Sequence, residues 1–443
     1  MCGIFGIYSH TTNSELITEV INGLKLLQHR GSDGCGIAYL TSDLKLKLLK
    51  MLGKVKDGFK DYKNSEDSFI CIGHVRYSTS GKTVTENTTT TDKNNELQPF
   101  IGKNKSNNLI SIVHNGNIPN LKQHDTQYIL DIILNSNLPV EETLISIMNN
   151  IAASYNLLII VDKILYVMKD RYGIRPLCIG YKEDKVYVSS ETRPLEYCKN
   201  IREIKSGEIL KISENKVETI YIHPCSVNSL CAFELIYFMN PKSYINGQHI
   251  YSIREQLGVA LATKEKIIPK KSDYIVVGIP SSGLIAARAY AKTLNLQYIQ
   301  LIKKVENCVN GEDRTFILIN NTERIKACRK KFKFESDKIK NKKIILVDDT
   351  IVRGNVIKTV INSIKICEAK EIHVRIPAPP VVDRCQLGIA IQNKKELIMN
   401  NRTINEVKDI LGVLSLNYLT LDELTMFPKN AYKECFGGEM IKI

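Results

Sequence analysis

Several features that mark other classes of protein are missing from this sequence of 443 residues. No apolar run approaches the length of a membrane span, and the N-terminus lacks the basic-then-apolar pattern of a secretory signal. None of the 12 cysteines forms a Cys-x-x-Cys pair, and a chain of this size without a secretory signal rarely depends on disulfides. We therefore expect a cytoplasmic protein with free thiols that does not bind a membrane.

A concentrated basic tract is also missing, although the formal net charge is +14. The lysines are spread thinly, and no aromatic residues alternate with them in the way that nucleic-acid binding favours. A solvated, lysine-rich surface is the better interpretation, and attraction of anionic small molecules to local pockets stays open. The sequence has no internal repeat, and its one low-complexity segment, 86–96, is expected to be an exposed loop.

What is present is an ordinary globular composition, with 43% hydrophobic and 24% charged residues, long enough for two or three domains. The first half mixes short strands with a helix expected over 14–27, with Ser14 as its possible N-cap. In the second half, apolar strands such as 273–280 and 342–349 alternate with helices, which predicts a parallel sheet covered on both faces. The segment 221–230 reads as a junction between the halves.

The stretch IILVDDTIVRGNV (344–356) joins an apolar strand to a helix. It brings the carboxylates of Asp348 and Asp349 to the edge of the sheet where open α/β folds bind ligands. The unpaired N–H groups at the start of the helix suit a phosphate, and Gly354 permits the bend. Carboxylates would repel that phosphate unless they bind ribose hydroxyls and a magnesium ion. The alternative is an acidic strand end that only caps a helix.

The first eight residues, MCGIFGIY, place a cysteine directly behind the initiator methionine. Cys2 could be a small buried hydrophobe, as free cysteines usually are. Alternatively, removal of Met1 would give Cys2 a free α-amine with a pKa of roughly 7.7–8.0, which could act as the base that generates the reactive thiolate. These residues alone do not decide between the two interpretations.

Two sets of motifs carry a resemblance to a known family. The 344–356 stretch resembles the phosphoribosyl pyrophosphate (PRPP) motif of type I phosphoribosyltransferases, and GIPSSG (278–283) resembles their pyrophosphate loop. The first half contains, in order, LQHRGSDGCGI (27–37), IGHVRYSTSG (72–81), QPF (98–100), IVHNGNIPN (112–120), KDRYGIRPL (169–177) and SSET (189–192). Together they resemble glutamine phosphoribosylpyrophosphate amidotransferases over almost the whole chain. Among glutamine amidotransferases, only this family adds a PRPP motif to the shared N-terminal motifs.

The resemblance implies a fold and a reaction. It predicts an N-terminal-nucleophile αββα sandwich over residues 1–222, followed by a type I phosphoribosyltransferase parallel sheet over residues 223–443. Glutamine would be hydrolysed at the N-terminal Cys2, and the ammonia would displace pyrophosphate from C1 of PRPP, giving 5-phosphoribosylamine and glutamate. This is the first step of de novo purine biosynthesis. The resemblance also implies purine nucleotide feedback inhibitors and a homo-oligomer, a dimer or a tetramer.

The same resemblance assigns roles to individual residues. Asn115 and Gly116 would stabilise the oxyanion formed at Cys2. Glutamine would be bound by Arg76, Asp125 and Arg30, with Arg76 on its α-carboxylate. The predicted PRPP ligands are Asp348, Asp349, Thr350, Ile351, Val352, Arg353, Gly354, Asn355, Lys303 and Arg314, and the predicted Mg²⁺ site comprises Ser282, Asp348 and Asp349. His29, His74 and His114 have no metal-ligand spacing and are interpreted as structural.

The sequence departs from the family pattern at three places: Ser281, Gln127 and the longer segment 303–314. A further departure concerns a 4Fe-4S cluster that one branch of the family carries on four cysteines. Cys231, Cys385 and Cys435 match that set, but the fourth position is Tyr432, and Cys225 is a poor substitute. That branch also usually has a propeptide, which this sequence lacks. We therefore expect the three cysteines to be packed as small hydrophobes.

Two other functions share part of this pattern. A glutamine-dependent sugar isomerase, such as glucosamine-6-phosphate synthase, would share the N-terminal motifs but would carry isomerase repeats in place of VDDTIVRG. A non-catalytic regulatory protein with the same fold would explain the altered 303–314 segment, but the presence of Cys2, Arg76, Asn115 and Asp125 argues against it.

Overall fold

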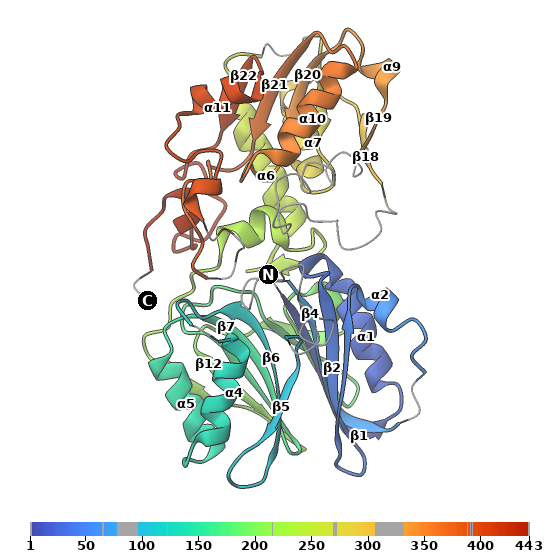
Figure 1. Cartoon of the computed structure of the whole chain (residues 1–443), viewed down its shortest axis with the longest axis vertical. Helices are drawn as coiled ribbons and strands as arrows, with labels where there is room; N and C mark the ends of the chain where they lie inside the picture. Colours follow the sequence, from blue (N-terminus) through green and yellow to red (C-terminus); the bar gives the residue numbers. More distant parts are fainter. Residues whose placement is uncertain are drawn as a thin grey trace.

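The computed structural model describes residues 2–63, 66–77, 96–121, 123–214, 216–268, 273–305, 332–387, 389, 391 and 393–441. Two sheets of the first half lie face to face, and a third sheet, with its own helices, is built from the second half (Figure 1). No helix of these residues is long and apolar enough to cross a membrane.

The first sheet of the sandwich has the strand order β11-β9-β10-β1-β4-β2-β3 and is antiparallel throughout. Its strands are β1 (Gly3–Asn13), β2 (Gly34–Thr41), β3 (Leu46–Leu52), β4 (Ser68–Arg76), β9 (Cys178–Lys182), β10 (Lys185–Ser189) and β11 (Lys199–Glu203). The helices α1 (Leu16–Leu26) and α2 (Val55–Gly58) cover its outer face. Helix α1 falls within the segment predicted to be helical, but its N-cap is Glu15 and not Ser14.

The second sheet has the order β13-β12-β8-β7-β6-β5. Its strands are β5 (Phe100–Lys103), β6 (Leu109–Asn117), β7 (Ser154–Val161), β8 (Ile164–Lys169), β12 (Glu208–Ile212) and β13 (Val217–Ile222). The helices α4 (Asp125–Asn135) and α5 (Val140–Asn150) pack on its outer face.

Alternation along the strands builds the layers of the sandwich. On β1, Ile4 and Tyr8 point into the core between the two sheets, whereas Phe5 and Ile7 point into the core beneath α1. Because side chains on a strand alternate between faces, a strand with apolar residues on both sides must be covered on both. The pattern of β1 agrees with the αββα arrangement, in which the second sheet covers one face and α1 the other.

The second half forms a five-stranded parallel sheet with the order β17-β16-β20-β21-β22. Its strands are β16 (Tyr274–Gly278), β17 (Gln297–Tyr298), β20 (Lys343–Val347), β21 (Glu371–Ile376) and β22 (Ser415–Tyr418). The helices around it are α6 (Ile250–Thr263), α7 (Gly283–Leu294), α9 (Ser336–Ile339), α10 (Asn355–Ile366) and α11 (Ile404–Leu411). Two further two-stranded sheets pair β14 (Tyr244–Ile245) with β15 (Gln248–His249), and β18 (Ile302–Lys304) with β19 (Phe332–Phe334). The predicted parallel sheet is confirmed.

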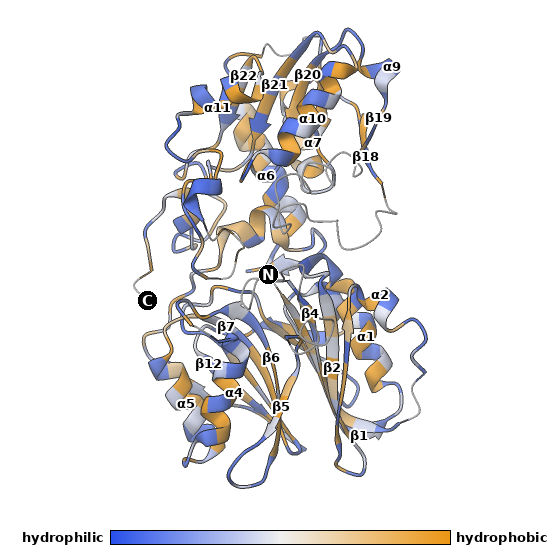
Figure 2. Cartoon of the chain, viewed as in Figure 1, coloured by the Kyte–Doolittle hydropathy of each residue, from blue (hydrophilic) through white to orange (hydrophobic). Residues whose placement is uncertain are grey.

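Hydropathy follows these layers (Figure 2). Orange, apolar stretches run along the central strands of the upper sheet, and blue residues lie on the outward sides of the helices. The strands β16 and β20 are almost entirely buried, as expected where helices cover both faces of a parallel sheet.

Candidate active sites

A narrow pocket lies next to Cys2 in the first half, where residues at the ends of β1 and β4, on β6 and at the start of α4 come together. It is lined by Cys2, His74, Arg76, Tyr77, Gln98, His114, Gly116, His124 and Asp125. Four residues predicted to act on glutamine, Cys2, Arg76, Gly116 and Asp125, thus share one pocket although they are up to 123 positions apart in the sequence.

Cys2 is buried at the start of β1. Its thiol donates a hydrogen bond to the Tyr77 carbonyl oxygen (3.6 Å), and its own carbonyl oxygen accepts one from Arg30 Nε (2.9 Å). Burial raises the pKa of the thiol, while the positive N-terminus and Arg76 act in the opposite direction. A buried thiol of this kind needs a nearby base to become a nucleophile.

Asn115 and Gly116 lie side by side on β6, and only Gly116 lines the pocket. The Asn115 side chain is buried, and its Nδ2 donates weakly to Ser190 Oγ (3.4 Å). A side chain at Gly116 would not fit, because a Cβ there would lie 2.0 Å from the Ser154 carbonyl oxygen on β7. The glycine is therefore required by the close approach of β6 and β7.

Arg76 and Asp125 supply opposite charges to the pocket. Arg76 ends β4 and pairs with Glu96 (Nη2–Oε2, 2.5 Å). Asp125 begins α4, and its carboxylate accepts the Thr126 N–H (2.8 Å). Burial acts to raise the pKa of Asp125. The charges of His114 and His124, together with the hydrogen bonds from His114 and the Thr126 N–H, outweigh burial and hold this pKa below its usual range. A carboxylate that stays ionised suits an ammonium group.

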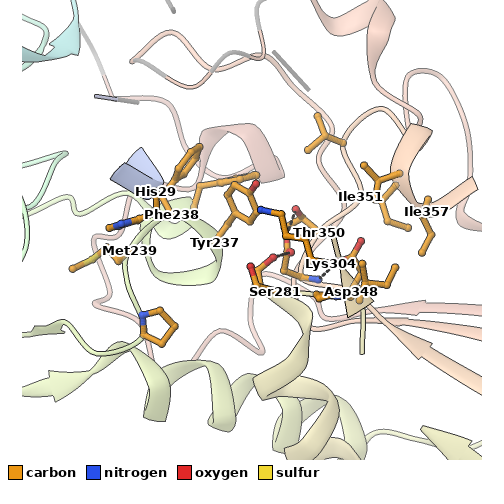
Figure 3. Close-up of a pocket in the computed structure, with 18 of the residues that line it drawn as sticks. His29, Tyr237, Phe238, Met239, Ser281, Lys304, Asp348, Thr350, Ile351 and Ile357 are labelled. Carbon is orange, nitrogen blue, oxygen red and sulfur yellow. Dashed lines mark hydrogen bonds between the residues drawn. The ribbon is translucent and has the colours of Figure 1, made fainter. Parts of the chain in front are cut away.

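A second, larger cavity of about 780 Å³ opens at the edge of the parallel sheet. Every residue from Asp348 to Asn355 lines it, as do Ser281 and Ser282. Figure 3 shows Asp348, Thr350 and Ile351 at one end of this pocket. Gly354 has a φ of 81°, a left-handed conformation that favours glycine, so the turn before α10 has the backbone shape that the sequence predicted.

The two adjacent carboxylates are held from both sides. Asp349 accepts hydrogen bonds from the Ser282 hydroxyl and from Thr350 Oγ1 (2.7 Å), and Asp348 accepts the Asp349 N–H (3.0 Å). Burial raises the pKa of Asp349, against these hydrogen bonds. The described residues contain no group of three or more His, Cys, Asp or Glu placed to hold a metal. Two carboxylates and a hydroxyl nevertheless fit Mg²⁺, which usually takes one or two carboxylates and completes its shell with substrate phosphates and water.

The structure distinguishes two neighbouring lysines. Lys303, predicted to bind PRPP, is 64% exposed at its side chain and pairs with Glu335 (2.7 Å) outside the cavity lining. Lys304 lines the cavity (Figure 3), because successive side chains on β18 face opposite sides. Arg314 lies outside the described residues.

A buried ionic cluster joins the two halves behind Cys2. Arg30, predicted to bind glutamine, lines neither pocket. Its guanidinium instead pairs with Glu191 (2.6 Å) and with Glu234 (2.6 Å) from the π-helical turn Glu234–Phe238 of the second half. All three side chains are fully buried. The structure thus places Arg30 between the nucleophile and the second half.

The two pockets are neighbours across one aromatic contact. Tyr77 lines the Cys2 pocket, Phe238 lines the larger cavity, and their rings meet edge to face with centroids 6.3 Å apart. The segment Phe233–Pro241 contributes several apolar side chains to the larger cavity on this side. Only a thin wall therefore separates the two candidate sites.

The three candidate cluster cysteines lie near one another at the base of the second half. Cys231 forms a β-bridge with Tyr432, and Cys385 is a neighbour of both Cys231 and Cys435. Burial raises the pKa of Cys231 to about 11 and that of Cys435 well above its usual value. The Tyr432 hydroxyl donates to Glu434, and Cys225 is exposed. Cysteine therefore stands at three of the four expected cluster positions, and the fourth is a tyrosine engaged with Glu434.

Comparison with known proteins agrees with this geometry. A family model described as a glutamine amidotransferase domain matches residues 85–197, and one described as a phosphoribosyl transferase domain matches residues 255–382. An amidophosphoribosyltransferase of Methanocaldococcus jannaschii is 35% identical over 96% of this chain and 93% of that protein. One of Rattus norvegicus is 33% identical over 96% of this chain and 88% of that protein. The chain belongs to the amidophosphoribosyltransferase family.

Solved structures support the same assignment. The glutamine PRPP amidotransferase of B. subtilis, complexed with ADP and GMP, has a TM-score of 0.84 at 27% identity and covers 99% of this chain and 97% of its own. The amidophosphoribosyltransferase fold predicted from the motifs is confirmed, as is the activity: the chain is a glutamine-hydrolysing phosphoribosyltransferase of purine biosynthesis.

Some pocket residues of this amidophosphoribosyltransferase were not predicted from the sequence. Arg254 on α6, Tyr237 and Lys304 line the larger cavity, and His124 lines the Cys2 pocket. Burial lowers the pKa of Arg254 to about 10. No local sequence pattern marks these residues. Each lines its pocket only because segments that are distant in the sequence pack together around it.

Proposed function

We propose that the two pockets divide the reaction between them. Glutamine is hydrolysed in the Cys2 pocket, and the ammonia attacks C1 of PRPP in the larger cavity, with release of pyrophosphate. The observation that supports this division is that Cys2, Arg76 and Asp125 line one pocket and the Asp348–Asn355 segment lines another, while Tyr77 of the first pocket and Phe238 of the second are in ring contact.

In the first pocket, Cys2 is the proposed nucleophile. Its α-amine, free once Met1 is removed, takes the thiol proton, and the thiolate attacks the glutamine carboxamide. Asn115 Nδ2 and the Gly116 N–H are the proposed oxyanion donors. Arg76 binds the α-carboxylate and Asp125 binds the α-amine of glutamine. Water then releases glutamate from the thioester.

In the second pocket, the turn Thr350–Asn355 and the start of α10 bind the 5′-phosphate through backbone N–H groups. Asp348 and Asp349 bind the ribose hydroxyls, and with Ser282 they are the proposed residues that hold Mg²⁺. The metal, when bound, would neutralise the pyrophosphate as it leaves. Lys304 and Arg254 are cationic side chains from the second half that line the same cavity, so we add them to the proposed PRPP ligands, with Lys304 in place of Lys303.

The domain bounds, nucleotide regulation, oligomeric state, location and cluster content are proposed as well. The last strand of the sandwich ends at Ile222, which supports domains at 1–222 and 223–443. Nucleotide feedback is proposed because the B. subtilis relative is complexed with ADP and GMP. A homo-oligomer and a cytoplasmic location follow from the enzyme class alone. We propose that no 4Fe-4S cluster is bound, because its fourth position is Tyr432, whose hydroxyl donates to Glu434; about four irons per chain after anaerobic purification would contradict this.

One set of assays tests the division of labour. Cys2→Ala should abolish glutamate release and glutamine-dependent synthesis of phosphoribosylamine, while synthesis from added ammonia continues, because the second pocket is intact. Cys225→Ala, at an exposed thiol, is the matched control. Loss of both activities in a folded Cys2→Ala protein would contradict two separate sites, and Met1 retained on active enzyme would contradict the proposed base.

A further inference from the structure

His29 stands at the boundary between the two pockets without a role in the reaction so far. It belongs to the 3₁₀ turn Gln28–Arg30 of the first half, yet it lines the cavity of the second. In Figure 3, His29, Phe238 and Met239 lie at one end of this cavity, and Asp348 and Thr350 lie at the other. Its neighbour Arg30 contacts the Cys2 backbone. On the proposed division of the reaction, ammonia passing from Cys2 to the far end of the cavity would pass beside this histidine.

The His29 ring is oriented by a buried carboxylate. Its Nε2 lies 2.7 Å from Glu191 Oε1, and Glu191 also accepts hydrogen bonds from Arg30 Nη1 (2.6 Å), the Asn240 N–H (2.8 Å) and Ser243 Oγ (2.8 Å). Although burial acts to raise it, the charges and hydrogen bonds of these partners hold the pKa of Glu191 below its usual range. A carboxylate that remains ionised fixes the proton on Nε2 and leaves Nδ1 as the acceptor.

This arrangement meets a requirement of the chemistry. A simple amine such as lysine has a pKa of roughly 10.4, so ammonia near neutral pH is mostly ammonium in water, and ammonium has no lone pair for attack on C1. The apolar side chains of Phe238 and Met239 disfavour a bare ammonium ion at this end of the cavity. The His29 ring lines the same cavity, and its Nε2 lies 2.7 Å from the Glu191 carboxylate, which would be the counter-ion of a ring that had taken up a proton.

We propose that His29, oriented by Glu191, is the proton acceptor that keeps the transferred nitrogen as neutral ammonia. An ammonium ion gives one proton to His29 Nδ1, the N–H bond electrons remain on nitrogen as its lone pair, and the imidazolium faces Glu191. Because the His29 side chain is 28% exposed, the ring returns the proton to solvent at the cavity surface. This role rests on the proposed passage of ammonia between the two pockets.

The other charged groups around the ring do not supply this function. They are Arg30 and Glu234 in the buried cluster behind it, Arg254 on α6, and Lys54, Lys56 and Lys304 on the cavity wall. The cations carry no free lone pair when protonated, and Glu234 is fully buried against Arg30. Asp348 lies at the far end (Figure 3), and the next residue, Asp349, lines the same cavity. The proposed ribose and Mg²⁺ contacts engage both carboxylates.

The test is the yield of phosphoribosylamine per glutamate released, measured from pH 7 to pH 9 with glutamine, PRPP and Mg²⁺. His29→Gln retains an N–H that can reach Glu191 but lacks a basic nitrogen, so a merely structural role would be preserved. The yield of the unmodified enzyme should be nearly independent of pH. That of His29→Gln should be low at pH 7 and rise by up to about tenfold per pH unit, as the neutral fraction of ammonia does.

Controls separate the possible failures. His249→Gln, at an exposed histidine that lines neither pocket, should behave as the unmodified enzyme, and added ammonia at pH 9 checks that each variant retains a working second site. Equal yields of His29→Gln and unmodified enzyme at every pH would overturn the role of His29. Absence of phosphoribosylamine in the unmodified enzyme would instead overturn the proposed function.

A measurement on the unmodified enzyme covers the case in which His29→Gln does not fold. With ¹⁵N-labelled histidine at pH 8, His29 should show a protonated Nε2 and a bare Nδ1, and ammonium chloride should shift the Nδ1 resonance more than sodium chloride does. A proton on Nδ1 under these conditions would overturn the proposal.

Discussion

Removal of the Glu234 carboxylate is expected to weaken the protein at the junction of its two halves. Arg30 donates to both Glu234 oxygens (2.6 and 3.1 Å), and Arg175 lies 3.6 Å from the same carboxylate. In Glu234→Ala, both buried guanidiniums lose this partner, and Arg30 keeps Glu191 as its carboxylate partner and the Cys2 carbonyl oxygen as an acceptor. Breaking a buried ion pair from one side costs about 3–5 kcal/mol, which is roughly a 10²- to 4 × 10³-fold change in the folding equilibrium.

The assay is urea unfolding followed by two probes, circular dichroism and tyrosine fluorescence, because a single free energy requires coincident transitions. Glu234→Ala should move both midpoints to lower urea, and glutamate release should fall, since Arg30 supports the Cys2 carbonyl. Glu234→Gln, which keeps an acceptor oxygen, should lose less. Asp43→Ala removes half of an exposed pair with Lys45 and should leave the midpoint unchanged.

An unchanged midpoint in Glu234→Ala would refute the reasoning, because it would mean that the buried guanidiniums had found water or other acceptors at no cost. A lower midpoint with normal glutamate release would keep the stability argument but refute the link between Arg30 and the nucleophile.

Three further predictions follow from the pockets and from one buried pair. Asp348→Asn and Asp349→Asn should each raise the KM for PRPP while thermal melting is unchanged; normal PRPP kinetics in both would contradict the proposed ribose and Mg²⁺ contacts. Gly116→Ala should abolish glutamate release, because its Cβ would lie 2.0 Å from the Ser154 carbonyl oxygen, while synthesis from added ammonia measures an intact second site. Burial acts to raise the pKa of Glu265, but its contacts with Arg375 outweigh this and hold it at about 2. Since the folded pKa is below the unfolded value, Glu265 stabilises the protein above about pH 5 and this contribution is lost as the pH falls towards 2. Unfolding midpoints of Glu265→Gln and the unmodified protein should therefore differ at pH 7 and converge in acid.

The segment proposed to bind PRPP could be located from the sequence alone, because Asp348 to Asn355 are contiguous and one strand, one turn and one helix start suffice to place them. The layers of the sandwich were implied by the family resemblance of the motifs, and strands such as β1, with apolar residues on both faces, agree with them. The order of the motifs indicated the family. It did not show that Cys2, Arg76 and Asp125, which belong to three separate chain segments, line one pocket.

Tertiary structure decided what depends on register and on contacts between the halves. Whether Lys303 or Lys304 faces the cavity depends on the pairing of β18 with β19, and a shift of one residue would exchange them. Arg30 and His29 are adjacent in a motif that gives no hint of their different surroundings. Arg30 is buried between Glu191 and Glu234, whereas His29 faces the cavity. This difference arises because the second half supplies Glu234, Asn240 and Phe238 from more than 200 positions away.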